Sequence, residues 1–433
     1  MTRPTETSLF STVTTLAARR TVHQAFGWFH AHAQELIRWQ MDLVVIPAPP
    51  FGEAERSAWA IERFMEAGLS EVRMDSVGNV FGIFPSTDHS AYPTTDFAGP
   101  VVVLSAHLDT VFPADVPLQP VLKDDRIEAP GIMDNAAGVI GMLAVAHAVV
   151  QAGVSVSVPI VFMANVGEEG EGDLRGVRHL YLHNALAGRI AAHIALDGAG
   201  TEAAVSTALG SQRYRITVRG PGGHSFTDAG TPNPIAALAA AVASFAEEHL
   251  PAEPRTTLNI GTMHGGTSVN SIPQSATATV DMRSTSAEQL LLLEVALYRA
   301  VEDAVEGRNR VCRSLIRSGT AVRSGTACTL TFEIEKIGDR PAAELAADSA
   351  LLLALRAVDR HLGLRTDLRL GSTDANLPLS MGVPAIALGA GGDGGGAHTE
   401  KEWYCAKDRE SGLRRILLLI LTMAEWAAAQ SDE

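Results

Sequence analysis

The sequence predicts an α/β protein with a mostly parallel sheet and a smaller domain inserted into it. Its 433 residues are more than one hydrophobic core usually organises, which favours two domains. On either side of the middle of the chain, short apolar runs occur without alternation, as in strands buried on both faces. Between about residues 209 and 340 the strand-like runs alternate polar with apolar residues, as in a sheet with one solvated face. We therefore expect residues 1–208 and 341–433 to form one domain and residues 209–340 to form the insertion.

Strands and helices alternate in the larger domain, which is the order of a layered α/β fold. The predicted buried strands are Val101–Ser105, Ile160–Asn165, Ile194–Leu196 and Ala385–Gly389. Residues 135–152 are small and apolar nearly all round, so they predict a helix packed against the sheet, with Asp134 or Asn135 as its cap. The apolar run Ile416–Met423 is too short to cross a bilayer and predicts a buried C-terminal helix.

The insertion follows the order β-α-β-β-α-β, which is that of a ferredoxin-like unit. Its predicted strands are residues 212–219, 257–263, 276–283 and 329–337, and its predicted helices are residues 234–249 and 287–306. Residues 307–327 are polar and carry the densest basic cluster of the chain, and we expect them to form a loop.

The composition indicates which kinds of partner and which cellular compartment to expect. A formal net charge of −15 argues against a nucleic-acid partner, which favours a basic face. The three cysteines, Cys312, Cys328 and Cys405, are odd in number and far apart, which predicts neither a disulfide framework nor a cysteine zinc site. The N-terminal segment is polar and threonine-rich and lacks the apolar core of a secretion signal. We expect a cytoplasmic protein without a membrane partner.

Metal-binding residue types follow the predicted strands of the larger domain. They are His107 and Asp109, the pair Glu168–Glu169, Asp197 and His398, together with Asp134 at the start of the central helix. In open α/β sheets ligands bind beyond the carboxyl ends of the strands, so these side chains are expected to meet at one edge. Imidazole and carboxylate groups are the ligands of catalytic zinc, and cobalt or manganese accept similar sites. The sequence therefore predicts a hydrolase that holds two zinc ions.

Chemical roles follow for several of these residues. Crowded like charges such as Glu168–Glu169 are costly unless cations neutralise them, so one glutamate can bind metal while the other acts as general base. Asp109 can hold the second ring nitrogen of His107. Asp134 can bridge two metals or simply cap the helix. In the insertion, His224 within GPGGHSF can stabilise an oxyanion or be an exposed loop histidine.

From about residue 35 onward, the chain resembles the co-catalytic zinc peptidase superfamily of peptidase T, carboxypeptidase G, aminoacylase and succinyl-diaminopimelate desuccinylase. The motifs that carry the resemblance are SAHLDTV, GEEG, LDG, GGHS, GGTSVNSIP and GAHTE, in this order and spacing. Asp197, where the deacetylase and desuccinylase side tends to have glutamate, and the segment GSTDAN make the chain look most like peptidase T. Many relatives have Asp-Asp-Lys-Gly where this chain has DNAAG from Asp134 to Gly138, so the bridging carboxylate is kept but the next acidic residue is an amide.

The resemblance implies a role for each matching position. The implied metal ligands are Asp134 between both zinc ions, Glu169 and His398 on one ion, and His107 and Asp197 on the other. Glu168 would be the general base, Asp109 would orient His107, and His224 would act on the active site of a partner subunit. The last role implies a homodimer formed through the inserted domain. The implied substrate contacts are Asn270, Arg283, Thr373 and Asn376.

Three functions compete on these grounds. The first is a zinc-dependent aminopeptidase or dipeptidase that acts on short peptides. The second is an amidohydrolase that releases N-acyl or N-carbamoyl groups from amino acids. The third is a non-catalytic binding protein that has kept the fold, which the presence of both the ligands and a free base disfavours.

Overall fold

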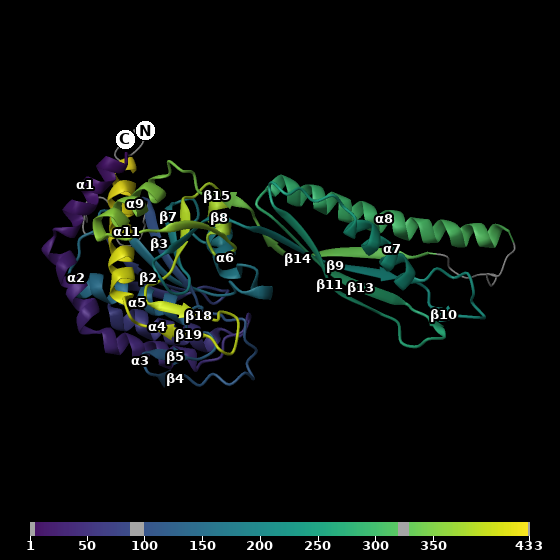
Figure 1. Cartoon of the computed structure of the whole chain (residues 1–433), viewed down its shortest axis with the longest axis horizontal. Helices are drawn as coiled ribbons and strands as arrows, with labels where there is room; N and C mark the ends of the chain where they lie inside the picture. The colour runs from purple at the N-terminus through teal and green to yellow at the C-terminus, as the bar shows by residue number, and fades with distance from the viewer. Residues whose placement is uncertain (1–4, 87–98, 319–328, 432–433) are drawn as a thin grey trace. The chain divides into compact units, whose positions relative to one another are not determined.

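The protein is described here by a computed structural model, which covers residues 5–86, 99–318 and 329–431. The chain divides into two compact units, one made of Met1–Ala208 with Glu344–Glu433 and the other of Leu209–Ala343 (Figure 1). The second unit starts at the first residue of the predicted insertion and ends at Ala343 rather than at residue 340.

The first unit is built on a nine-stranded sheet with the order β1-β2-β6-β3-β7-β17-β8-β15, in which β16 also pairs with β8. The strands are β1 Ser70–Met74, β2 Val80–Phe84, β3 Val101–His107, β6 Ile160–Asn165, β7 Ile190–Leu196, β8 Ala203–Ala208, β15 Ala343–Glu344, β16 Asp367–Gly371 and β17 Ala385–Leu388. Strand β3 runs parallel to both β6 and β7, and β7 runs parallel to β17. The centre of the sheet is therefore parallel, and every residue of β3 and β6 is buried. This confirms the predicted α/β class.

Helices cover both faces of this sheet (Figure 1). They are α1 Glu6–Ala17, α2 Arg20–Ala31, α3 Ala33–Val44, α4 Ala54–Ala67, α5 Ala136–Gln151, α6 Arg175–His183, α9 Ala350–Leu362, α10 Asn376–Ser380 and α11 Arg409–Ser431. Helix α6 packs on the side of Val103 and Val161, whereas α5 and α11 pack on β3 from the other side. Helix α5 lies close to Ala390 at Gly141, which has no side chain. A Cβ atom at Gly141 would lie only 2.6 Å from the Cβ atom of Ala390.

A small second sheet with the order β18-β19-β5-β4 completes the first unit. Its strands are β4 Val121–Lys123, β5 Arg126–Glu128, β18 Asp393–Gly395 and β19 Trp403–Cys405. The segment Ile416–Met423 lies inside α11 and is buried, as predicted. In the part of the chain that the structure describes, none of the helices combines the length and apolar character that a membrane span requires.

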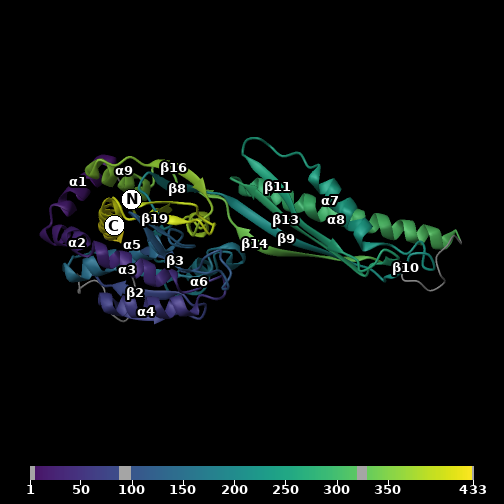
Figure 2. The same ribbon diagram turned by 60° about the horizontal axis from the view of Figure 1, so that its bottom comes forward.

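The second unit is a four-stranded antiparallel sheet with the order β11-β13-β9-β14. Its elements are β9 Gly210–Arg219, α7 Pro234–Ala246, β11 Thr256–Gly265, β13 Ser275–Ser284, α8 Ala287–Arg317 and β14 Thr331–Arg340, with the short pair β10 Gly223–His224 and β12 Ser271–Ile272. Both helices pack on one face of the sheet (Figure 2). On that face Tyr214, Ile216 and Val218 are buried and alternate with less buried residues of β9. Chain order and sheet order together are those of a ferredoxin-like unit, as expected.

Helix α8 is longer than predicted, because residues 307–317 continue it instead of forming a loop. Val305, Asn309 and Cys312 recur on its buried face at helical spacing. Asn309 is buried because its amide exchanges two hydrogen bonds with the backbone of Leu330. A buried polar residue interrupts the apolar pattern of the helix. Periodicity therefore does not reveal that residues 307–317 are helical. Residues 319–327 of the predicted loop lie outside the described residues.

The cysteine prediction was wrong in one respect. Cys312 in α8 is disulfide-bonded, although the number and spacing of the cysteines predicted no disulfide framework. Cys405 in β19 is a buried free thiol.

Candidate active site

The predicted metal ligands lie at the carboxyl edge of the parallel strands. His107 is the last residue of β3, Glu169 follows β6, and Asp197 directly follows β7. Asp134 precedes α5, and His398 lies between β18 and β19. A parallel sheet gathers residues from distant parts of the chain in this way because its strands all end at the same edge.

The two carboxylate oxygens of Asp134 face two different groups of side chains. Asp134 Oδ1 lies 3.3 Å from His107 Nε2, which in turn lies 3.9 Å from Asp197 Oδ1. Asp134 Oδ2 lies 3.1 Å from His398 Nε2, which is 3.0 Å from Glu169 Oε1. Each side thus has one imidazole nitrogen and two carboxylates, with Asp134 shared between them.

These donors fit a pair of divalent cations. Ligand atoms of His107, Asp134 and Glu169 all lie within 4.8 Å of one another. Asp134 Oδ1 is buried and has no hydrogen-bond partner among the described residues, even though His107 Nε2 is near. A buried carboxylate oxygen without a partner is costly, and a cation at this point would satisfy it. Mixed imidazole and carboxylate sets suit zinc and also accept cobalt or manganese.

Opposite charges inside the cluster shift its proton equilibria strongly. Burial alone would lower the pKa of His107, but the carboxylates of Asp109, Asp134 and Asp197 outweigh it and hold that pKa well above its usual value. Hydrogen bonds to Asp134 and Glu169 raise the pKa of His398 to about 10. Burial raises the pKa of Asp134, but the two histidines reverse this and lower it. Protons on the imidazoles therefore balance the carboxylates, and divalent cations would replace them on binding.

Asp109 holds the turn that carries the two glutamates. Its fully buried carboxylate accepts the N–H of Glu168 at 3.0 Å and that of Glu169 at 2.7 Å. His107 Nδ1 is nearer to the backbone oxygen of Asp109, at 3.1 Å, than to its carboxylate, at 3.7 Å. Asp109 therefore fixes His107 chiefly through its backbone, while its side chain fixes Glu168 and Glu169. The sequence did not suggest this second role.

Asn135 directly follows Asp134, and its amide has a defined structural task. Its Nδ2 donates to the carbonyl of Leu196 at 2.8 Å, and its Oδ1 accepts the N–H of Gly198 at 3.0 Å. The amide thus holds the two residues on either side of Asp197. Although Asn135 occupies the N-cap position of α5, its side chain makes no capping hydrogen bond. Gly138 allows this contact, because a Cβ atom there would lie 2.1 Å from Asn135 Oδ1.

Three buried charged residues next to the ligands escaped prediction. Arg56 in α4 donates to the carbonyl of Leu108 at 2.8 Å and so supports the end of β3. Asp374 accepts a hydrogen bond from Asn165 Nδ2 at 2.7 Å, and burial raises its pKa to about 7. Glu402 accepts three backbone N–H groups around Asp134, and burial raises its pKa to about 7 as well. Charged residues read as surface residues in a sequence, so only their position in space reveals these roles.

Two of the predicted substrate contacts are buried and bind each other. Asn376 Oδ1 accepts the N–H of Thr373 at 2.8 Å, and Thr373 Oγ1 accepts the N–H of Ala375 at 3.2 Å. Asn376 is fully buried and Thr373 is nearly so. These contacts shape the loop that carries Asp374, which favours a structural role for Asn376 over direct contact with a substrate.

The remaining predicted residues belong to the second unit. His224 and Asn270 lie on neighbouring segments, joined by the hydrogen bond from Ser225 N–H to the Asn270 carbonyl at 3.0 Å. His224 is exposed, and its Nδ1 accepts the N–H groups of Phe226 and Thr227 at 3.2 and 3.3 Å. In the neutral ring the proton is therefore on Nε2, which is free to donate.

Arg283 lies toward the other end of this unit's sheet. It is near the end of β13, whereas His224 and Asn270 are near the start of that strand. Its Nε donates to Asp281 Oδ2 at 2.8 Å. The structure therefore brings His224 and Asn270 together and separates Arg283 from them.

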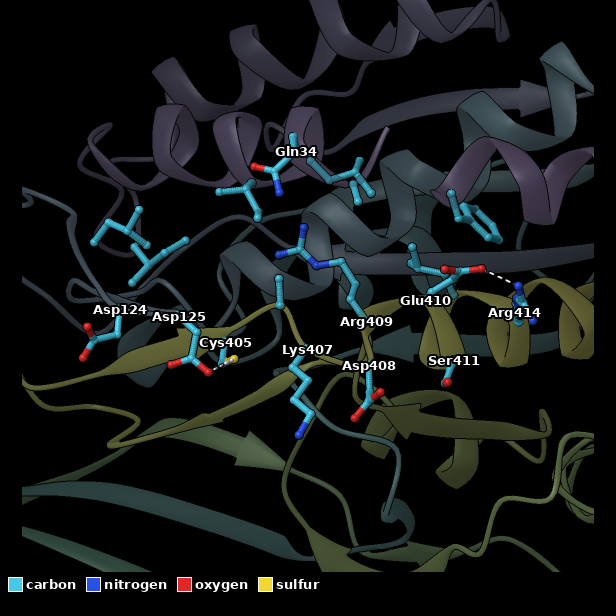
Figure 3. Close-up of a pocket in the computed structure, with 18 residues that line it drawn as sticks. Gln34, Asp124, Asp125, Cys405, Lys407, Asp408, Arg409, Glu410, Ser411 and Arg414 are labelled. Carbon is cyan, nitrogen blue, oxygen red and sulfur yellow. Dashed lines mark hydrogen bonds and ion pairs between the residues drawn. The ribbon is translucent and has the colours of Figure 1, made fainter. Parts of the chain in front are cut away.

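A cavity of about 820 Å³ lies elsewhere in the first unit, between α3, the β4–β5 hairpin and the start of α11. Figure 3 shows Gln34, Asp125 and Arg409 around it. None of the predicted metal ligands lines this cavity. Its size alone does not make it the active site, because the convergent ligand groups are at the sheet edge.

Known proteins share sequence and fold with this chain. The model of peptidase family M20/M25/M40 matches residues 103–422. A probable carboxypeptidase of Aspergillus fumigatus is 28% identical over 305 residues, which cover 65% of this chain and 68% of that protein.

Solved structures share the fold at low identity. Aminopeptidase PepT of Bacillus cereus is 21% identical with a TM-score of 0.66, and the match covers 90% of this chain and 98% of that one. A dinuclear metal-binding peptidase of Bacillus subtilis is 17% identical with a TM-score of 0.60, covering 92% and 99%. The family match extends over well more than half of the chain and confirms the resemblance seen in the motifs. The chain belongs to peptidase family M20/M25/M40 and is a metallopeptidase or a closely related metal-dependent amidohydrolase.

Proposed function

We propose that the protein is a di-zinc exopeptidase that cleaves amino acids from di- and tripeptides, with Glu168 as the general base. The observation that carries this proposal is the position of Asp134, whose two oxygens face His107 and His398 respectively. One shared carboxylate between two imidazole and carboxylate sets is the arrangement expected of two metals that act on one substrate.

In this proposal His107, Asp134 and Asp197 hold one zinc ion, and His398, Asp134 and Glu169 hold the other. Bound there, the ions would supply Lewis-acid activation of the scissile carbonyl and of the attacking water. Cobalt or manganese can replace zinc, because the ligand set does not discriminate strongly among these metals.

The chain's own residues supply the proton transfers. Glu168 is buried beside Glu169, and the hydrogen bond from its N–H to Asp109 fixes its backbone. With Glu169 engaged as a ligand, Glu168 is the carboxylate that accepts a proton from the attacking water and passes it to the leaving amine. His224 Nε2–H is suited to donate to the oxyanion that forms on the substrate.

We further propose that the protein acts as a homodimer formed through the second unit. From Ser275 to Arg283 the strand β13 extends about 26 Å, at about 3.3 Å per residue. An extended dipeptide is only about 7 Å long. If Arg283 and the pair His224–Asn270 both contact one substrate, they must therefore come from two copies of the chain. The substrate would be a short peptide, and we expect the protein to work in the cytoplasm.

A second candidate is hydrolysis of N-acyl or N-carbamoyl amino acids, which needs the same metals and base. The two functions differ in the group that the enzyme recognises next to the scissile bond. A carboxypeptidase activity, as in the name of the fungal relative, would in turn require a free substrate carboxylate.

A substrate panel tests the proposal. The chelated protein, reloaded with zinc, cobalt or manganese, would be assayed on di- and tripeptides that are free, N-acetylated or C-amidated. We expect hydrolysis of the free peptides that depends on added metal and is lost when the α-amine is acetylated. Unchanged turnover of the acetylated peptides would favour the amidohydrolase, and loss only on C-amidation would favour a carboxypeptidase. Failure of every metal to restore any amide hydrolysis would leave a non-catalytic binding protein.

A further inference from the structure

We infer that Glu402 is a positioning residue for the metal centre, because its buried carboxylate fixes the backbone of Asp134 and joins it to the loop of His398. This inference rests on the proposed function, since it concerns the same pair of metal sites. Glu402 is completely buried in the first unit.

Three backbone donors converge on the Glu402 carboxylate. Oε1 accepts the N–H groups of Met133 and Asp134, both at 2.7 Å, and Oε2 accepts the N–H of Gly131 at 2.9 Å. All three bonds end on one side chain, so the carboxylate holds the backbone of residues 131–134 at a single point. The peptide that carries the shared ligand is thus held directly by Glu402.

The backbone of Glu402 is itself fixed. The next two residues, Trp403 and Tyr404, pair with β5, and the Glu402 carbonyl accepts the N–H of Ala129 at 3.0 Å. Glu402 therefore holds both ends of the segment 129–134, Ala129 through its backbone carbonyl and Asp134 through its carboxylate. A side chain carried directly before a paired strand is a more rigid support than one on a free loop.

Glu402 also ends the turn that carries His398. Its N–H donates to the Thr399 carbonyl at 3.1 Å, one residue after His398. One residue therefore links the loop of the shared ligand Asp134 to the loop of a ligand that belongs to a single metal. We expect the distance from Asp134 Oδ2 to His398 Nε2, and with it the affinity of both metals, to depend on Glu402.

The position requires a carboxylate rather than an amide. All three backbone partners are donors, so they require two side-chain oxygens that accept hydrogen bonds. An amide has the same shape but would turn an N–H donor toward one of these N–H groups. Glu402→Gln therefore disturbs the contact without changing the volume, and Glu400→Gln, which removes the same charge from an exposed position of the same loop, is its matched control.

The test is a zinc titration of the metal-free proteins in metal buffers, read as stoichiometry and affinity without any substrate. We expect the wild-type and Glu400→Gln proteins to bind two ions alike, and Glu402→Gln to bind them about 10- to 100-fold more weakly. Urea unfolding of the same metal-free samples reports the stability of the fold. At saturating zinc we expect a lower kcat with a KM within about twofold of the wild-type value, because the residue supports the metals rather than the substrate.

The possible outcomes distinguish the inferred role of Glu402 from the proposed di-zinc function. If Glu402→Gln lowers the unfolding free energy but binds zinc like Glu400→Gln, Glu402 is merely structural and the inference is wrong. If the wild-type protein binds no zinc, cobalt or manganese, the proposed function fails and the inference falls with it. Should Glu402→Gln not fold, Glu402→Asp keeps the charge but withdraws it by one methylene, and the same loss of zinc affinity is expected from it. Wild-type affinity in Glu402→Asp would count against the inference.

Discussion

At the scale of single residues, Glu168 and Glu169 are chemically alike but differ in what surrounds them. Glu169 Oε1 faces His398 Nε2 at 3.0 Å, which puts it in the ligand cluster. Both backbone N–H groups are held by Asp109, so the two side chains are presented from one rigid turn. On such a turn Glu169 can bind the metal while Glu168 acts as the general base.

The first prediction follows from this division. We expect Glu168→Ala to lose turnover by at least about 100-fold, the usual contribution of a general base, while it keeps two metals per chain. Glu169→Ala is expected to lose both activity and one metal, because it removes a ligand. Metal analysis after gel filtration, together with a peptide assay, measures both properties. Equal loss of metal in the two variants would contradict this division, and loss from Glu168→Ala alone would reverse the assignment of base and ligand.

The second prediction concerns the amide of Asn135. Asn135→Asp would place a carboxylate oxygen against the Leu196 carbonyl, which now accepts a hydrogen bond from Nδ2. We expect the variant to lose about 1–3 kcal/mol of unfolding free energy in the metal-free state, as for a buried polar group left without its partner.

Asn233→Asp is the matched control for this change. Asn233 caps α7 with an oxygen that only accepts hydrogen bonds, and aspartate caps a helix equally well. Its unfolding free energy in urea should stay within a few tenths of a kcal/mol of wild type. A loss for Asn135→Asp no larger than that of the control would show that the donor of Asn135 contributes nothing.

At the scale of elements, the buried strands were predictable and the far part of α8 was not. Strand β6 occupies the predicted residues, and β3 and β7 differ from prediction only in their ends. Continuous apolar runs are a strong signal because a strand buried on both faces tolerates few alternatives. In α8 the buried Asn309 has a tertiary partner in Leu330, which no local pattern reveals.

His193 connects three elements and yields the third prediction. It lies in β7, and its ring contacts Ser105 Oγ of β3 at 2.8 Å and the Tyr181 hydroxyl of α6 at 3.1 Å. Burial lowers the pKa of His193 to about 3, compared with 6.5 for an exposed histidine. Between these values the unfolded chain binds a proton that the folded protein excludes, so stability falls as the pH decreases from 6.5.

His193→Gln removes this proton linkage. We expect the wild-type unfolding free energy, relative to that of the variant, to fall by about 1.4 kcal/mol per pH unit below pH 6. Urea unfolding of the chelated proteins at pH 7, 6 and 5 gives this difference, in which all shared titrating groups cancel. Parallel pH profiles would mean that His193 is protonated in the folded protein.

At the scale of the whole molecule, the separation of Arg283 from His224 and Asn270 within one insertion leads to the fourth prediction. If His224 acts on the partner's site, His224→Ala and Glu168→Ala damage complementary halves of each site. Each variant alone should be inactive. Mixed after dissociation, they should recover roughly a quarter of wild-type activity, because half of the dimers are mixed and each mixed dimer has one intact site of two.

The control mixes Glu168→Ala with Glu169→Ala, which damage the same half of the site. This pair should stay inactive, whatever the exchange of subunits. If the first mixture also stays inactive although mixed dimers are present, His224 acts within its own chain or has no role in catalysis.

The sequence by itself determined the α/β class, the inserted ferredoxin-like unit and the family, because these depend on periodicity and on motifs whose order is readable along one chain. It also named the residues that form the cluster at the sheet edge, since parallel strands end at the same edge whatever their order. The tertiary structure alone decided how these residues are supported. The carboxylates of Asp109 and Glu402 and the amide of Asn135 act through backbone groups of segments distant in sequence. Such contacts leave no local pattern, because the partner backbone atoms are the same in every residue.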